Sequence, residues 1–152
     1  MKTPKILLYK GRGMVSRLIR WQTNGSYSHA ALQRPDGRII EAWHKPPKVR
    51  LTRLKDWSNV EAYEVVGMTP EQWDEAIAWA ESQIGKKYDF GGVMRFVTRW
   101  RKKQDDKWFC SELVFEAIKR AGVPLLERVQ CSQVSPTVLS FSPLLMRSEP
   151  IK

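Results

Sequence analysis

The alternation of apolar and polar residues divides the first half of the chain into short strands. The expected strand segments are Lys5–Tyr9, Tyr27–Arg34, Arg38–Trp43, Val49–Leu54 and Val60–Val66. The second and third segments flank Pro35, Asp36 and Gly37, residues typical of a tight hairpin turn. Strands of this length joined by short turns predict an antiparallel sheet.

A helix is predicted directly after the strands because the residues at its start can cap it. Thr69 can act as the N-cap, Pro70 suits the first helical position, and Gln72 completes a capping box. Gly85 is expected to end the helix. The apolar residues expected to form its buried stripe are Trp73, Ile77, Ala80 and Ile84.

A second helix is predicted from about Cys110 to Ala121, with Gly122 as its end. Its inward-facing residues are expected to be Leu113, Val114, Ala117, Ile118 and Ala121. A shorter helix is expected at Met14–Trp21, and Val134–Met146 is apolar but interrupted by prolines. These patterns predict an α+β fold in one domain spanning residues 1–152, with the Cys110 helix packed against an antiparallel sheet.

Composition narrows the class of protein. The chain has 152 residues, 42% of them apolar, enough for one core. No apolar run approaches the roughly 18 residues of a membrane span or the h-region of a signal peptide. We therefore expect synthesis and folding in the cytoplasm, with signal-independent export left open. Reduced cysteines are expected there, and with two histidines and no CxxC or HExxH motif, no metal or cofactor is expected.

The positive charge lies at the start of the chain. Net charge is +10, and residues 1–55 hold 13 Lys and Arg against 2 Asp and Glu, an excess of +11. A field of this sign favours anionic partners such as a cell-wall polymer, an anionic lipid surface or nucleic acid. Simple solubility explains the same charge equally well.

Cys110 is the candidate nucleophile because it stands where a helix begins. The positive end of a helix dipole favours the thiolate, which is the reactive form of cysteine. The alternative is a buried structural cysteine, the commoner role for an arbitrary cysteine. Glu112, two residues later, is expected to stabilise the helix start and is given no catalytic role.

The hairpin register offers a base and its partner. If Arg34 pairs with Arg38 across the turn, His29 and Glu41 have the same parity and project from one face as diagonal neighbours. A neutral imidazole can take the thiol proton, and a carboxylate can fix its tautomer. His44 has the other parity and is expected to point away. A register slip of one residue would exchange Glu41 for His44.

The order of these segments resembles a known family. The stretches YSHAAL, IIEAW, KKYDFGG and FCSELVFEAIKRAG, within about residues 5–122, resemble the permuted NlpC/P60 papain-like cysteine hydrolases of the YiiX/YebB-like group. In ordinary NlpC/P60 enzymes the cysteine helix precedes the histidine, whereas here it follows. The resemblance implies Cys110 as nucleophile, His29 as base and Glu41 as the orienting residue. It also implies that Tyr88 helps to stabilise the oxyanion.

The chain departs from the family in two ways that bear on its substrate. It carries a basic insert, Arg95–Lys107, between the tyrosine and cysteine segments, and it shows no secretory signal. The first hypothesis is an amidase or endopeptidase acting on peptidoglycan peptides. The second is a thiol-dependent acyl hydrolase or acyltransferase acting on lipids, with the insert at a membrane interface. A non-enzymatic nucleic-acid binder carries the least weight, because no nucleic-acid motif occurs.

Overall fold

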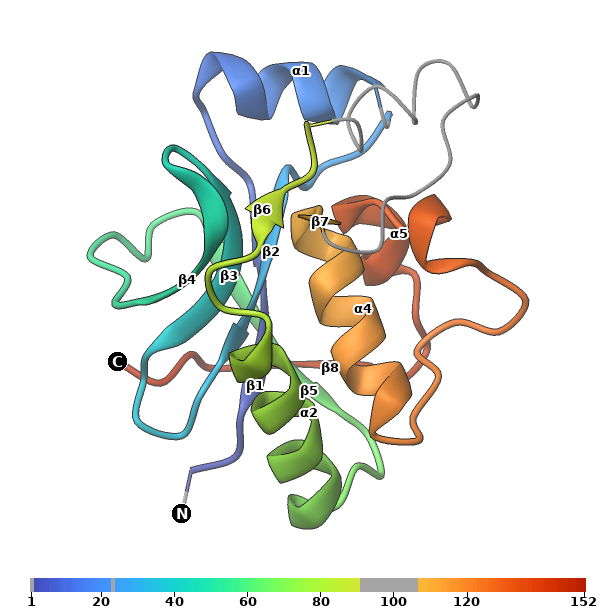
Figure 1. Cartoon of the computed structure of the whole chain (residues 1–152). Helices are drawn as coiled ribbons and strands as arrows, with labels where there is room; N and C mark the ends of the chain where they lie inside the picture. The colour runs from blue at the N-terminus through green and yellow to red at the C-terminus, as the bar shows by residue number, and fades with distance from the viewer. Residues whose placement is uncertain (1, 23, 91–106) are drawn as a thin grey trace.

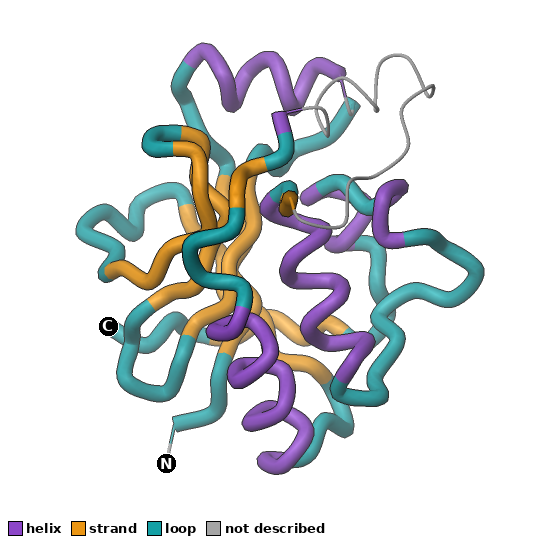
Figure 2. The backbone as a smooth tube through the Cα atoms, in the orientation of Figure 1, coloured by secondary structure: helices purple, strands orange, loops and turns teal. Residues whose placement is uncertain are grey.

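The computed structural model describes residues 2–22, 24–90 and 107–152, and within them one curled sheet is flanked by helices (Figures 1 and 2). The eight strands lie in the order β7-β6-β4-β3-β2-β1-β5-β8. Their bounds are β1 Lys5–Tyr9, β2 His29–Gln33, β3 Ile39–His44, β4 Pro47–Thr52, β5 Val60–Val65, β6 Lys87–Tyr88, β7 Lys107–Trp108 and β8 Leu145–Ser148. Every neighbouring pair is antiparallel except β6 and β7, so the predicted α+β class is confirmed.

The β2–β3 hairpin has the predicted register. Leu32 pairs with Ile40, and the backbone N–H of Arg34 donates to the carbonyl of Arg38 at 2.8 Å. Gly37 takes a φ of 83°, a left-handed conformation that side chains resist. This register sets which side chains of β2 and β3 share a face.

The helices are α1 Met14–Gln22, α2 Pro70–Ser82, α4 Cys110–Arg120 and α5 Pro136–Ser140, with a 3₁₀ turn η1 at Cys131–Gln133. The capping box of α2 is present, with Thr69 and Gln72 each bonding the other's backbone N–H. The expectation that Ile84 is buried is wrong, because α2 ends at Ser82 and Ile84 is 42% exposed. Ala76 is buried between Trp73 and Ala80 instead.

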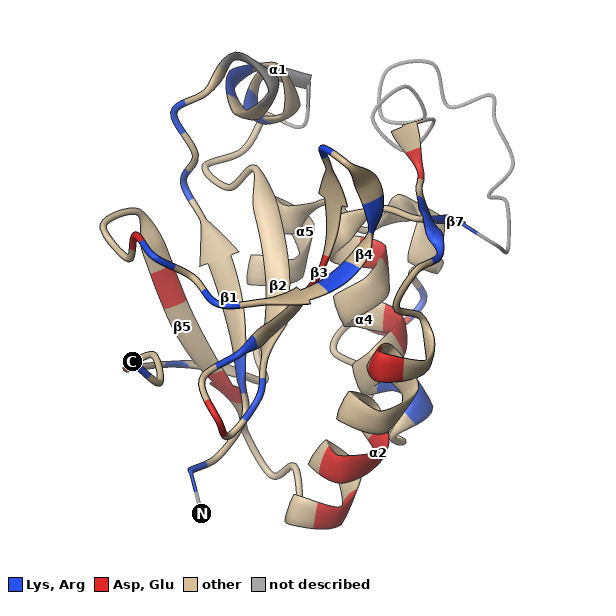
Figure 3. Cartoon of the chain, turned by 60° about the vertical axis from the view of Figure 1, so that its left-hand side comes forward, with Lys and Arg blue, Asp and Glu red and all other residues tan. Residues whose placement is uncertain are grey.

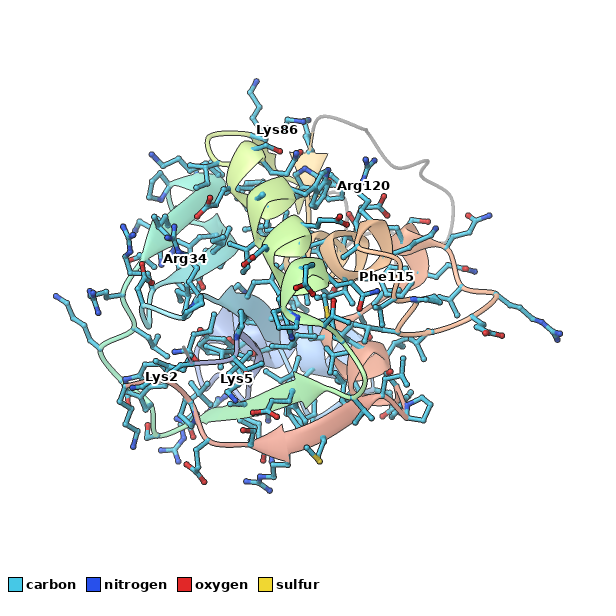
Figure 4. All side chains as sticks on the ribbon, turned by 90° about the horizontal axis from the view of Figure 1, so that it is seen from below. Lys2, Lys5, Arg34, Lys86, Phe115 and Arg120 are labelled. Carbon is cyan, nitrogen blue, oxygen red and sulfur yellow. The ribbon has the colours of Figure 1, made fainter. Side chains whose placement is uncertain are left out.

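Helix α4 packs against both helix α2 and strands β2 and β3, and its buried side chains belong to the main core (Figure 1). All five residues expected to face inward are buried. Phe115 of α4, labelled in Figure 4, is only 1% exposed. Ala30 and Leu32 of β2 belong to the same apolar cluster as the helix, so packing of the two elements fixes where Cys110 stands.

The C-terminal region adds an edge to the sheet. β8 pairs with β5, with Val65 opposite Leu145. Most of the basic insert Arg95–Lys107 lies outside the described residues, and Lys107 belongs to β7. Among the helices of the described ranges, none combines the length and apolar content needed to cross a membrane.

Candidate active site

Cys110 and His29 meet at the ends of their elements. Cys110 is the first residue of α4 and His29 is the first residue of β2. The Cys110 side chain is close enough to the imidazole of His29 to raise the pKa of that ring. Cys110 is 1% exposed, and the His29 side chain is 12% exposed. The predicted approach of these two side chains is therefore observed.

Glu41 holds the other side of the imidazole ring. Its Oε2 atom lies 2.6 Å from Nε2 of His29, as the hairpin register predicts for diagonal neighbours. Because Glu41 takes Nε2, Nδ1 is the ring nitrogen left for the sulfur of Cys110. His44 follows Trp43 on β3, and the centroids of their two rings lie 4.7 Å apart. His29 thus has Glu41 hydrogen-bonded on one side of its ring and Cys110 as a neighbour.

Arg50 is a partner that the sequence did not indicate. It lies on β4 opposite Glu41, and its Nε and Nη2 atoms donate to Oε1 of Glu41 at 2.9 and 2.7 Å. Its guanidinium also stacks over the ring of Trp43, 4.6 Å from the centroid. The alternation in β4 could have placed Arg50 on this face only once the pairing of β3 with β4 was known. Glu41 is therefore bound at both oxygens.

Two aromatic rings flank the imidazole, and neither was predicted. Tyr9 at the end of β1 contacts the His29 ring edge-on at 4.9 Å, and Trp43 of β3 does so at 5.2 Å. The hydroxyl of Tyr9 is buried and has no hydrogen-bond partner among the described residues. Burial, followed by the charge of Glu41, raises the pKa of Tyr9, so this hydroxyl stays protonated.

The charges of the site stabilise one another. Burial would lower the pKa of His29, but the charge and hydrogen bond of Cys110 and the contact with Glu41 raise it to about 10. Burial would raise the pKa of Glu41, but the bond to His29 and the guanidinium of Arg50 hold that pKa below its usual value. The imidazole is thus protonated at neutral pH.

Tyr88 lies close to Cys110 from a third direction. It is a buried residue of β6, and its ring contacts Phe109, the residue before Cys110, at 5.9 Å. Burial raises the pKa of Tyr88, and the charge of Cys110 adds to the effect, which places the phenol within electrostatic range of the sulfur. The neutral phenol can donate a hydrogen bond to a developing negative charge.

The other two residues considered, Glu112 and Cys131, make contacts with the backbone. Glu112 is fully buried, and its carboxylate accepts the backbone N–H of Phe109 at 3.4 Å, closing the start of α4. The second cysteine, Cys131, lies in the turn η1, where its thiol donates to the Glu112 carbonyl at 3.5 Å. Within the described ranges, no group of three His, Cys, Asp or Glu residues is placed to hold a metal ion.

Residues 6–135 match the family described as permuted papain-like amidase enzyme, YaeF/YiiX, C92 family. The chain belongs to this family. Among solved structures, the crystal structure of the metalloprotein yiiX from Escherichia coli O157:H7 is similar, with a TM-score of 0.75 and 22% identity. The alignment covers 99% of this chain and 97% of that one. No match was found among curated proteins.

Membership of the C92 family agrees with the predicted resemblance to YiiX-like papain-type enzymes and with the observed fold. It assigns the chain to a family of amidases, and hence of hydrolases. The likeness to yiiX, at 22% identity, concerns the fold. The word metalloprotein describes that protein.

Proposed function

We propose that this C92 protein is a cysteine hydrolase that cleaves an amide bond, with Cys110 as nucleophile, His29 as acid and base, and Glu41 as the orienting residue. The observation that carries the proposal is the placement of His29 between Glu41, to which it is hydrogen-bonded, and Cys110, which raises the pKa of His29. A thiolate beside an imidazolium held by a carboxylate is the arrangement that nucleophilic catalysis by cysteine needs.

The reaction begins with attack of the Cys110 thiolate on the substrate carbonyl carbon. The oxyanion that forms is stabilised by the hydroxyl of Tyr88 together with the positive end of α4. His29 gives its proton to the leaving amine, which leaves a thioester on Cys110. His29 then takes a proton from water, the water attacks the thioester, and the acid product leaves with the thiolate restored.

The proposed substrate is a peptide of peptidoglycan. An anionic wall polymer would concentrate a protein of net charge +10, whose positive excess lies in residues 1–55. A second candidate is a thiol-dependent acyl hydrolase or acyltransferase that acts on a lipid. The observation that favours it is the exposure of two large apolar side chains on α1, Leu18 at 47% and Trp21 at 77%.

The test is to incubate the protein with muropeptides and, separately, with phospholipid vesicles, and to identify products by mass spectrometry. We expect a new amine and carboxylate from the muropeptides. Cys110→Ala should abolish the product, whereas Cys131→Ser should retain it, because Cys131 contacts the backbone of Glu112. A product that forms equally with Cys110→Ala would refute the assignment of the nucleophile. Cys110-dependent release of a fatty acid would select the second candidate.

A further inference from the structure

Two large apolar side chains of helix α1 face outward. Leu18 and Trp21 are three residues apart, so they are neighbours on one helix face, and they are 47% and 77% exposed. Ile19 faces the core and is 5% exposed, while Nη1 of Arg20 donates to the carbonyl of Gly11 at 3.2 Å. The helix is therefore anchored by other residues, and folding does not explain why Leu18 and Trp21 are apolar.

Positive side chains flank this apolar pair. Helix α1 contains Arg17 and Arg20 and no acidic residue, and the chain leading into it carries the exposed Arg12, while Lys10 is paired with Glu61. An open hollow beside the helix is lined by Arg17, Arg20, Trp21, Asn24 and Gly25. Two guanidiniums and an indole suit a phosphate group at the boundary between water and hydrocarbon.

Negative charge is concentrated on helix α2. Helix α2, at the opposite end, has no Lys or Arg and carries Glu71, Asp74, Glu75 and Glu81 (Figure 3). In Figures 1 and 3, α1 stands at one end and α2 at the other. A charge separation of this kind turns a protein so that its basic end faces an anionic surface.

We propose that α1 is a peripheral membrane-binding surface for anionic phospholipid. Leu18 and Trp21 enter the interface, where an aromatic ring with a polar edge is favoured. Arg17 and Arg20 bind headgroup phosphates in the hollow beside them. An anionic membrane is the chosen partner because it would bind both the apolar pair and the positive charge. A nucleic acid would bind the positive charge alone.

The surface lies at the end of the molecule that holds the candidate active site. The segment from Lys10 to Ser28 leaves β1 directly after Tyr9 and enters β2 at His29, and these two residues face each other across the strands. Helix α4 also begins at this end (Figure 1). Docking through α1 would bring Cys110 to the membrane surface, where a membrane-associated substrate would be within reach.

The experiment is vesicle flotation with the full chain. Vesicles of phosphatidylcholine alone are compared with vesicles that contain about 30% phosphatidylglycerol. We expect at least about tenfold more protein on the anionic vesicles, and loss of binding in high salt, because headgroup attraction is screened. Equal binding to both vesicles, or binding to neither, would overturn the proposal.

Substitutions in α1 test which of its residues bind the membrane. Leu18→Ser with Trp21→Ser should reduce flotation about tenfold or more, and Arg17→Glu should reduce it at least about fivefold, the effect of one charge near the surface. The matched controls are Met146→Ser, 53% exposed on β8, and Lys2→Glu near the N-terminus, both expected to bind normally. Circular dichroism checks that each variant is folded.

Two outcomes separate this proposal from its alternatives. Cys110→Ser should float like the wild type, so membrane binding can be judged whether or not the protein is a cysteine hydrolase. If a single-stranded oligonucleotide binds through Arg17 and the α1 variants float normally, the surface serves nucleic acid, and the membrane assignment is wrong.

Discussion

At the scale of single residues, the His29 ring is restrained on three sides. The rings of Tyr9 and Trp43 pack against it in T-shaped contacts, and Glu41 forms a hydrogen bond with Nε2. Glu41 is itself held by two donors of Arg50. The ring therefore presents Nδ1 to Cys110 without having to reorganise, which is the condition for fast proton transfer.

Glu41→Gln should keep the fold and impair turnover. A glutamine can still accept a bond from Arg50, but it has no charge to stabilise the imidazolium of His29. Loss of the orienting carboxylate costs up to about 10⁴-fold in turnover in serine proteases. The matched variant His44→Ala should change turnover little. Rates on the muropeptide substrate give the comparison, and a larger loss in His44→Ala would require a triad with His44 as third member.

Cys110 should alkylate faster than Cys131 near neutral pH, although Cys110 is the more buried of the two. Cys110 stands at the start of a helix, and the His29 beside it keeps its proton to about pH 10, so positive charge lies next to the sulfur. Iodoacetamide labelling with peptide mass analysis measures both sites. Equal rates, or faster labelling of Cys131, would contradict the assignment of Cys110.

The residues of the site differ in how far the sequence reveals them. His29 and Glu41 could be paired because a short turn, with Arg34 bonded to Arg38, fixes the β2–β3 register. Tyr9 and Arg50 could not be found in this way. β1 reaches β2 only after the intervening α1 segment. β4 follows β3 through the turn at Lys45 and Pro46, but the pattern of apolar and polar residues alone does not give the register that sets Arg50 opposite Glu41.

At the scale of elements, helix α2 is specified by its first turn. The Thr69 hydroxyl accepts the backbone N–H of Gln72 at 3.2 Å. Thr69→Ala should lower the free energy of unfolding by about 1 kcal/mol, because the N–H loses its partner. Urea denaturation measures this, with Thr3→Ala, an exposed threonine ahead of β1, as the control. Equal stability of the two variants would show that the cap contributes nothing.

Glu61 of β5 ties the loop before β2 to the sheet. Its carboxylate accepts bonds from Tyr27, from Tyr63 at 2.9 Å and from Lys10 at 3.0 Å. Burial opposes ionisation, but these bonds lower the pKa of Glu61 to about 2. The stabilisation is therefore present above the ordinary carboxyl pKa of about 4.3 and is lost as pH falls towards 2.

Glu61→Gln should accordingly remove part of the acid sensitivity of the fold. The variant should be less stable than the wild type by about 1–2 kcal/mol at pH 7, and the difference should shrink between about pH 4 and about pH 2. Urea denaturation at a series of pH values measures the difference. Glu149→Gln, an exposed carboxylate near the C-terminus, is the control. A difference that does not vary with pH would contradict the low pKa.

At the scale of the whole molecule, the site exists only when distant segments assemble. Strands β1 to β4 supply Tyr9, His29, Glu41 and Arg50. Cys110 comes from α4, which follows β6 and β7 in the chain. Strands β1 to β5 were predicted because each has five or six residues with a clear apolar pattern. β6 and β7 have two residues each, too few to carry a period, so tertiary pairing alone defines them.

Ionic strength should affect turnover according to the charge of the substrate. The net charge of +10 raises the local concentration of an anionic polymer, an attraction that salt screens. With intact peptidoglycan, kcat/KM should fall about tenfold between about 0.05 and about 0.5 M NaCl. With a small uncharged peptide amide, kcat/KM should change little, because Cys110 is buried and salt screens the charges around it poorly. If salt lowered kcat/KM equally for both substrates, the effect would lie in the catalytic residues and long-range attraction would play no part.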